Sequence, residues 1–192
     1  DATTYYLEIV QPTRGGAILG AESGPQPIDA ELTLTRKIDE GYHAVGWRGD
    51  IMDLYPNGDS LEVIMDKPRK IWLAIEPNIY TITYANTQGV TNLNPVTYTI
   101  EDEVIFNPLP YIEGWKFTGW SPASIAKGSI GLKNVTANWE RVSNSVTIGG
   151  VSTNIAYGTE VTFRAPEPWV DVTNGTQIAY LGTTFTAPIV TN

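Results

Sequence analysis

A short phrase that occurs twice is the feature that most limits how this chain can fold. Residues 39–47 read DEGYHAVGW and residues 112–120 read IEGWKFTGW, at a constant offset of 73 residues. Under this offset the glycines and the last tryptophan coincide: Gly41 with Gly114, Gly46 with Gly119, and Trp47 with Trp120. Self-similarity at a fixed spacing indicates that one structural unit is used more than once. The chain is therefore predicted to consist of small modules.

Strand-like segments around the phrase give these modules their predicted bounds. TYYLEIV precedes the first copy and IYTITY the second, and the copies are followed by KIWLAIE and NVTANWE. Each copy then spans about 65–75 residues, near the lower limit for a core that folds alone. We expect modules at residues 1–77 and 78–141, and a divergent or truncated β module at residues 142–192.

Apolar and polar residues alternate with a period of two in most of the remaining sequence. Examples are YTITY, VTYTI, LTLT, SVTI and EVTF, separated by the turn sequences PNGD, NTQG, IGG and TNGT. Alternation of β-branched and aromatic residues with polar ones indicates half-buried strands. Gly (18) and Pro (13) leave little room for helices. The prediction is a mainly β chain of small antiparallel modules with little or no helix, except one possible helical turn at 121–128.

Five motifs follow one another between residues 80 and 140: YTITY, NPVTYTIEDEVIF, EGWKFTGW, IAKGSIG and TANWE. Their order and spacing resemble the Listeria–Bacteroides repeat, the family typified by the B-repeats of internalin-type surface proteins. Residues 3–77 resemble a more divergent bacterial variant through DEGYHAVGWRGD, and residues 143–192 share YGTEVTF with the opening of such repeats. The resemblance implies a β-grasp-like fold and tandem, usually non-catalytic extracellular modules without cofactors.

Composition excludes several classes of function. The chain of 192 residues has 12 basic and 21 acidic residues, a net charge of −9, which disfavours nucleic acids and anionic membranes. No apolar run approaches the ~20 residues that a membrane span needs. Cysteine is absent, so disulfides and thiol catalysis are excluded.

Catalytic residues are not apparent in the sequence. His43 is the single histidine, and it stands where the second copy of the phrase has Lys116, so we expect it to face solvent. The acidic run Glu101–Glu103 reads as a solvated turn, because neighbouring side chains on a strand point to opposite faces. The chain is therefore predicted not to be an enzyme.

The first copy carries an acidic insertion, GDIMDLYPNGDSLE, that the second copy lacks. Asp53, Asp59 and Glu62 offer the oxygen ligands that Ca²⁺ favours, although their spacing is not that of an EF-hand loop. The alternative is an acidic loop that ends in an Asn-Gly turn. An enlarged loop is also a plausible place for specificity, with Asp50, Asp53, Asn57 and Asp59 as candidate binding residues.

Tryptophans could form a sugar-binding face or the core. Four of the six lie on the recurring framework, which favours core packing: Trp47, Trp72, Trp120 and Trp139. Trp115 is expected to be half-buried, and Trp169 is the best candidate for an exposed ring.

Phe117 and Trp120 are an odd number of positions apart and would point to opposite faces of an unbroken strand. If Trp120 is a core residue, either Gly119 marks a bulge or a bend, or a neighbouring module covers the other face. The residues assigned a structural role are Gly41, Gly46, Trp47, Gly114, Gly119, Trp120 and Trp139.

Two functions remain open on this basis. The first is a non-catalytic stalk, spacer or display segment of a bacterial or phage surface protein, in contact with neighbouring modules of the same chain. The second is an adhesion module that binds a host glycan or protein through the first-copy loop or Trp169. Both imply an extracellular location, on a cell surface or a phage virion, without direct insertion into a membrane.

Overall fold

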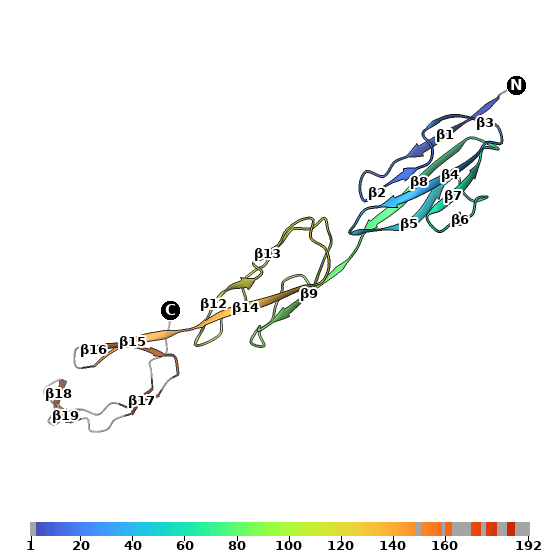
Figure 1. Cartoon of the computed structure of the whole chain (residues 1–192). Coiled ribbons are helices and arrows are strands. Elements are labelled where there is room, and N and C mark those ends of the chain that lie inside the picture. Colours follow the sequence, from blue (N-terminus) through green and yellow to red (C-terminus); the bar gives the residue numbers. More distant parts are fainter. Residues whose placement is uncertain are drawn as a thin grey trace. The chain divides into compact units, whose positions relative to one another are not determined.

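The computed structural model describes residues 3–148, 151–158, 160–162, 170–173, 176–179 and 184–186. Strands joined by turns make up the regular structure of these residues, and none of them lies in a helix (Figure 1). The predicted mainly β class with little or no helix is thereby confirmed. Over the same ranges, no helix could span a membrane.

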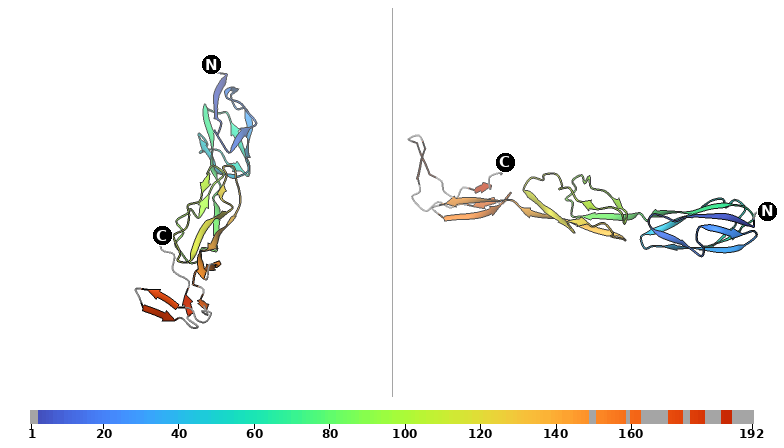
Figure 2. Two further views of the ribbon diagram at one scale, coloured as in Figure 1. Left: turned by 90° about the vertical axis from the view of Figure 1, so that its left-hand side faces the viewer. Right: turned by 90° about the horizontal axis from the view of Figure 1, so that it is seen from above.

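Residues 4–77 form two four-stranded sheets that face each other (Figure 1, Figure 2). Side chains from both sheets build one core, in which Leu7, Leu34, Leu61 and Ile71 are fully buried. The first sheet has the order β3 (Gly24–Pro27), β1 (Thr4–Val10), β8 (Arg69–Pro77) and β5 (Tyr42–Gly49). The second has the order β2 (Gly16–Leu19), β4 (Glu31–Ile38), β7 (Ser60–Ile64) and β6 (Pro56–Asn57).

A third four-stranded sheet contains the second copy of the phrase. Its order is β10 (Thr97–Tyr98), β9 (Tyr80–Ala85), β14 (Lys133–Arg141) and β12 (Trp115–Ser121). The other strands form two-stranded pairs. These are β11 (Val104–Ile105) with β13 (Ser124–Ile125), β15 (Ser143–Ile148) with β16 (Val151–Ala156), β17 (Glu160–Thr162) with β20 (Thr184–Thr186), and β18 (Val170–Thr173) with β19 (Thr176–Ala179).

The chain divides into two compact units, each made of several segments. Unit 1 contains residues 1–83, 95–105 and 124–134, and unit 2 contains residues 84–94, 106–123 and 135–192. In unit 1, the buried Tyr98 donates its hydroxyl proton to the carbonyl of Gly131. In unit 2, an aromatic cluster of Tyr84, Phe106, Phe117, Trp120 and Trp139 has ring centroids 5.2–6.0 Å apart. The three modules expected from the sequence stay a prediction.

The two copies of the phrase share a strand with a bulge. Pairing of β5 with β8 shifts between Ala44 and Gly46, and pairing of β12 with β14 shifts between Phe117 and Gly119. The inserted residue reverses the alternation, so Phe117 and Trp120 come within 5.5 Å of each other, centroid to centroid. Trp47 and Trp120 are only 3% and 6% exposed. Both the bulge at Gly119 and the burial of the two tryptophans are confirmed.

Three local predictions are wrong. β1 pairs with β8 in parallel, which departs from the expected antiparallel pairing. The proposed helical turn at 121–128 contains the short strand β13 and a turn closed by a bond from the Ser129 N–H to the Ala126 carbonyl. Isolated helical turns are marginal without packing, so weak capping signals do not establish one. Only Thr97 and Tyr98 of VTYTI form a strand.

Turn predictions fare better. A turn forms at PNGD, but one position later than an Asn-Gly turn would place it. Asn57 pairs with Ser60, so the two-residue loop of the β6–β7 hairpin is Gly58 and Asp59, and Gly58 has a φ of 58°. NTQG is a turn in which the Val90 N–H donates to the Thr87 carbonyl. The glycines of IGG at 149–150 and the centre of TNGT at 174–175 lie outside the described residues.

Candidate functional site

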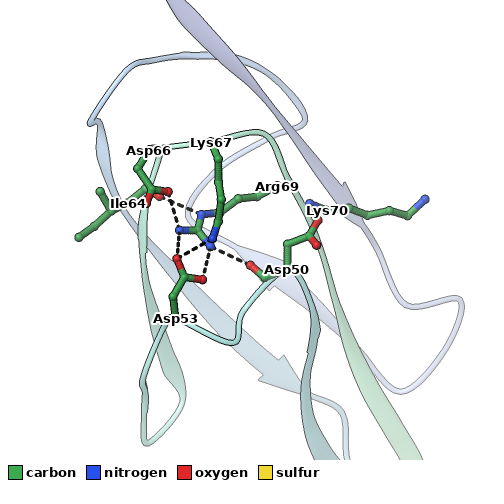
Figure 3. Close-up of polar contacts among 7 residues, drawn as sticks. All are labelled: Asp50, Asp53, Ile64, Asp66, Lys67, Arg69 and Lys70. Carbon is green, nitrogen blue, oxygen red and sulfur yellow. Dashed lines mark hydrogen bonds and ion pairs between the residues drawn. The ribbon is translucent and has the colours of Figure 1, made fainter.

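The acidic insertion is held in place by a buried arginine that the sequence analysis did not single out. Arg69, on β8, has a side chain only 1% exposed, and all of its donors are used (Figure 3). Its Nε donates to the Ile64 carbonyl, and its two terminal nitrogens donate to the Asp50 carbonyl, both carboxylate oxygens of Asp53 and one oxygen of Asp66, over 2.7–2.9 Å. A guanidinium has five N–H donors, so this group is fully satisfied.

Electrostatics follows from this arrangement. The hydrogen bonds from Arg69 and Lys67 hold the pKa of Asp53 well below its usual range. The hydrogen bond to Asp53 in turn raises the pKa of Arg69. Asp50 also accepts a bond from the Lys70 N–H and is therefore a second anchor of the loop. Buried Leu54 fixes the loop from the core side. Two of the candidate binding residues, Asp50 and Asp53, thus have structural partners.

The calcium candidate does not assemble. Asp53 is paired with Arg69 and Lys67, Asp59 with Arg36 at 2.9 Å, and Glu62 accepts from the Thr33 hydroxyl. Across the described part of the chain, no three His, Cys, Asp or Glu side chains gather as metal ligands would. The spacing of acids along the sequence misled because strand pairing directs each of them to a different cation or hydroxyl. Asn57 is exposed on β6, and binding through this loop stays a prediction.

The residues considered for catalysis lie as expected. His43 is exposed on β5, with its Nδ1 2.9 Å from the Asn78 Oδ1, and Lys116 is exposed at the matching position of β12. Glu101–Glu103 lie at a turn, in which Asp102 accepts from the N–H and the hydroxyl of Thr99. Glu101 differs from the predicted solvated turn, because its carboxylate accepts hydrogen bonds from Arg14 and from the Tyr42 hydroxyl.

Two tryptophans of the recurring framework do not share a role. Trp72 is 38% exposed, so its expected place in the core is wrong. It stands opposite Arg48, whereas Trp139 stands opposite Phe117 and is half-buried. Counted back from the closing glutamates Glu76 and Glu140, the two tryptophans differ by three positions, which places them on opposite faces of a strand. Trp169 lies outside the described residues.

The glycine that opens each copy of the phrase contacts the segment that follows that copy. Gly41 and Gly114 both have positive φ, 85° and 77°. The Gly41 carbonyl accepts from the Asn78 N–H at 2.8 Å, and the Gly114 carbonyl accepts from the Val142 N–H at 3.0 Å. A Cβ at Gly41 would overlap the side chain of Ile100, and one at Gly114 would overlap the ring of Tyr157. Glycine is thus required twice over, for its conformation and for the close approach.

A tyrosine–glutamate hydrogen bond accompanies each of these glycine contacts. In unit 1, the Tyr42 hydroxyl donates to Glu101 at 3.0 Å, and burial together with this bond raises the pKa of Tyr42. In unit 2, the Tyr157 hydroxyl donates to Glu113, which raises the pKa of Tyr157 to about 12. We call each combination of a glycine contact and a Tyr–Glu bond a junction. The sequence alone does not pair these residues, because 59 and 44 positions separate the partners.

An aromatic pocket of about 390 Å³ lies beside the second junction, in unit 2. Its walls include Tyr111, Trp115, Lys116, Phe117, Trp139 and Tyr157. The guanidinium carbon of Arg141 stands 4.8 Å from the centroid of the Trp115 ring. Clustered aromatic side chains with a few polar groups are typical of small-molecule sites. Aromatic residues are a candidate sugar-binding face from the sequence alone, but nothing in the sequence brings this set together.

Comparison with known proteins adds no identification: no protein-family model, no curated protein and no solved structure matches the chain. The resemblance to the Listeria–Bacteroides repeat therefore stays a prediction from the sequence motifs.

Proposed function

We propose that the chain is a non-catalytic extracellular structural segment, a stalk, spacer or display segment of a bacterial or phage surface protein. In this proposal, β modules follow one another along the chain, and each holds the next through a junction. The resemblance to surface-protein repeats supports the extracellular location, although a family analogy by itself is an associational argument.

The observation that carries the proposal is the recurrence of the junction. Gly41 and Gly114, 73 residues apart, each present a carbonyl and a bare Cα to the residues that follow their copy of the phrase. Each is accompanied by a Tyr–Glu hydrogen bond. Each junction lies within one compact unit but joins two of the modules predicted from the sequence, residues 1–77, 78–141 and 142–192. A contact that recurs with the phrase is expected of a protein that connects successive modules, because contacts between neighbours contribute to the stability of such arrays.

Solution scattering with a matched pair of glycine variants tests the proposal. Gly114→Ala adds a Cβ that overlaps Tyr157, whereas Gly89→Ala adds one at nearly the same φ, 76° against 77°, but into open space. Both variants pay the same conformational penalty, roughly 1–2 kcal/mol. A connector predicts an elongated wild-type particle, a broader range of particle dimensions for Gly114→Ala, and a Gly89→Ala profile that superposes on the wild type.

Two outcomes would contradict the proposal. The first is a wild-type scattering profile of a single compact globule. The second is turnover in a glycosidase, esterase or peptidase screen that follows the pure protein through purification. This result would contradict the proposal that the chain is non-catalytic.

A further inference from the structure

We propose that the aromatic pocket of unit 2 binds a neutral carbohydrate, with a pyranose ring packed against its aromatic walls. This goes beyond the connector function, because a connector needs no ligand. It also places the sugar at a site different from both the acidic insertion and Trp169.

The walls of the pocket suit a sugar ring. Tyr111 comes from the loop before β12, Trp115 and Phe117 from β12, Trp139 from β14, and Tyr157 from the segment after β16. One face of a pyranose carries C–H groups and its edge carries hydroxyls, so it needs apolar ring surface and hydrogen-bonding groups together. The volume of about 390 Å³ is within the range of small-ligand sites.

Polar groups at the pocket can meet the hydroxyls. Lys116 lines the pocket and is exposed on β12. Glu113 accepts the hydroxyl proton of Tyr157, which is a lining residue. Arg141 stands over the Trp115 ring. Positively charged donors and a negatively charged acceptor are therefore close to the aromatic walls. Such groups can hydrogen-bond the hydroxyls of a neutral ligand and orient it.

Charge argues against other ligands. A cationic ligand such as a quaternary ammonium would seek aromatic faces, but the guanidinium of Arg141 already stands over Trp115, and Lys116 adds a second positive charge. A polyanion would meet the carboxylate of Glu113, next to the lining residue Tyr157, and a chain with a net charge of −9. A neutral ligand with an apolar face avoids both penalties.

Nuclear magnetic resonance titration of the full chain tests this site. The probes are three neutral trisaccharides, cellotriose, maltotriose and the β-1,4-linked trimer of N-acetylglucosamine, and the readout is the indole N–H signal of each tryptophan. We expect the signals of Trp115 and Trp139 to shift with at least one trisaccharide, while that of the buried Trp47 stays in place. The shifts should saturate at millimolar sugar.

Substitutions separate this pocket from other exposed rings. Tyr111 is 70% exposed and Tyr55, in the acidic insertion, is 84% exposed, so neither Tyr111→Ala nor Tyr55→Ala removes a core residue. Loss of one aromatic wall should weaken binding about threefold to tenfold for Tyr111→Ala and leave it unchanged for Tyr55→Ala. Lys116→Met, at an exposed position, is a second test of the same pocket and should also weaken binding.

The proposal is overturned if none of the three sugars shifts the two indole signals at millimolar concentrations, or if Tyr111→Ala and Lys116→Met both bind like the wild type. Loss of binding in Tyr55→Ala would move the site to the acidic insertion. Shifts of the same two signals by a proline-rich peptide, in the absence of any sugar effect, would make the pocket a peptide site instead.

Discussion

Replacing the matching tryptophan by phenylalanine in the two copies of the phrase should cost different amounts of stability. The two side chains are buried to nearly the same extent, 3% for Trp47 and 6% for Trp120. They differ in their indole N–H. That of Trp120 donates to the Asn107 carbonyl at 2.8 Å, whereas that of Trp47 is buried and meets no acceptor among the described residues.

The magnitude follows from this difference. Both substitutions remove the same ring atoms from a core, so the packing loss cancels when the two are compared. Trp120→Phe also loses a hydrogen bond, which contributes about 0.5–1.5 kcal/mol net, although Asn107 keeps a bond from the Asn94 amide. Trp47→Phe removes an unsatisfied donor, whose burial costs about 1–3 kcal/mol. The two contributions add, so we expect Trp120→Phe to be the more destabilising by about 1.5–4.5 kcal/mol.

Amide hydrogen exchange is the suitable assay, because a chain of several units need not unfold in one step. Protection of β5 and β8 reports on Trp47→Phe, and protection of β12 and β14 reports on Trp120→Phe. Each variant serves as a control for the other, since it should leave the other sheet unchanged. Equal losses of protection, or a larger loss in Trp47→Phe, would refute the reasoning that the unpaired N–H separates the two copies.

Three further predictions concern the acidic insertion. Arg69→Lys should cost about 1–3 kcal/mol in unfolding experiments, because an ammonium cannot replace five N–H donors, whereas Arg36→Lys in an exposed ion pair should cost less than about 0.5 kcal/mol. Because the folded-state pKa of Asp53 is lowered, its contribution is present above the ordinary aspartate pKa of about 3.9 and is lost as the pH falls below it. Asp53→Asn should therefore flatten the acid limb of a stability curve measured by thermal melting, and an unchanged limb would contradict this. Calcium should not raise the melting temperature, because Asp59 and Glu62 have other partners; a rise that saturates with Ca²⁺ would show otherwise.

Alternation and turn chemistry were enough to predict several of the longer strands, such as β1, β4, β8, β9 and β14. They place YTITY in β9 and a turn at PNGD ahead of β7, because period-two burial and the turn preference of glycine act over a few residues. The odd spacing of Phe117 and Trp120 left a bulge, a bend or a covering module as alternatives, and the structure has the bulge, which brings both rings to one side. Each of these features depends on residues only a few positions apart, so the sequence is enough to predict it or to limit the alternatives.

Features that depend on distant pairing were missed. The parallel pairing of β1 with β8 joins segments more than 60 residues apart, and nothing in either strand records the direction of its partner. In the sequence, Arg69 is one of several charged residues before the apolar part of β8. Only the fold brings Asp50, Asp53 and Asp66 to its guanidinium. A hint was available, since an arginine close to several aspartates at the start of an apolar strand is a candidate for a buried ion pair.

The two Tyr–Glu bonds have a consequence for the order of the segments. In the first junction, the phrase supplies the donor, Tyr42, and the following segment supplies the acceptor, Glu101. In the second, the phrase supplies the acceptor, Glu113, and the following segment supplies the donor, Tyr157. The two phrases are not equivalent in this respect: the first has Glu40 where the second has Glu113, but the second has Trp115 where the first has Tyr42. Exchange of the segments is therefore asymmetric: the second phrase has no hydroxyl to donate to Glu101, whereas the first keeps a glutamate that could accept from Tyr157.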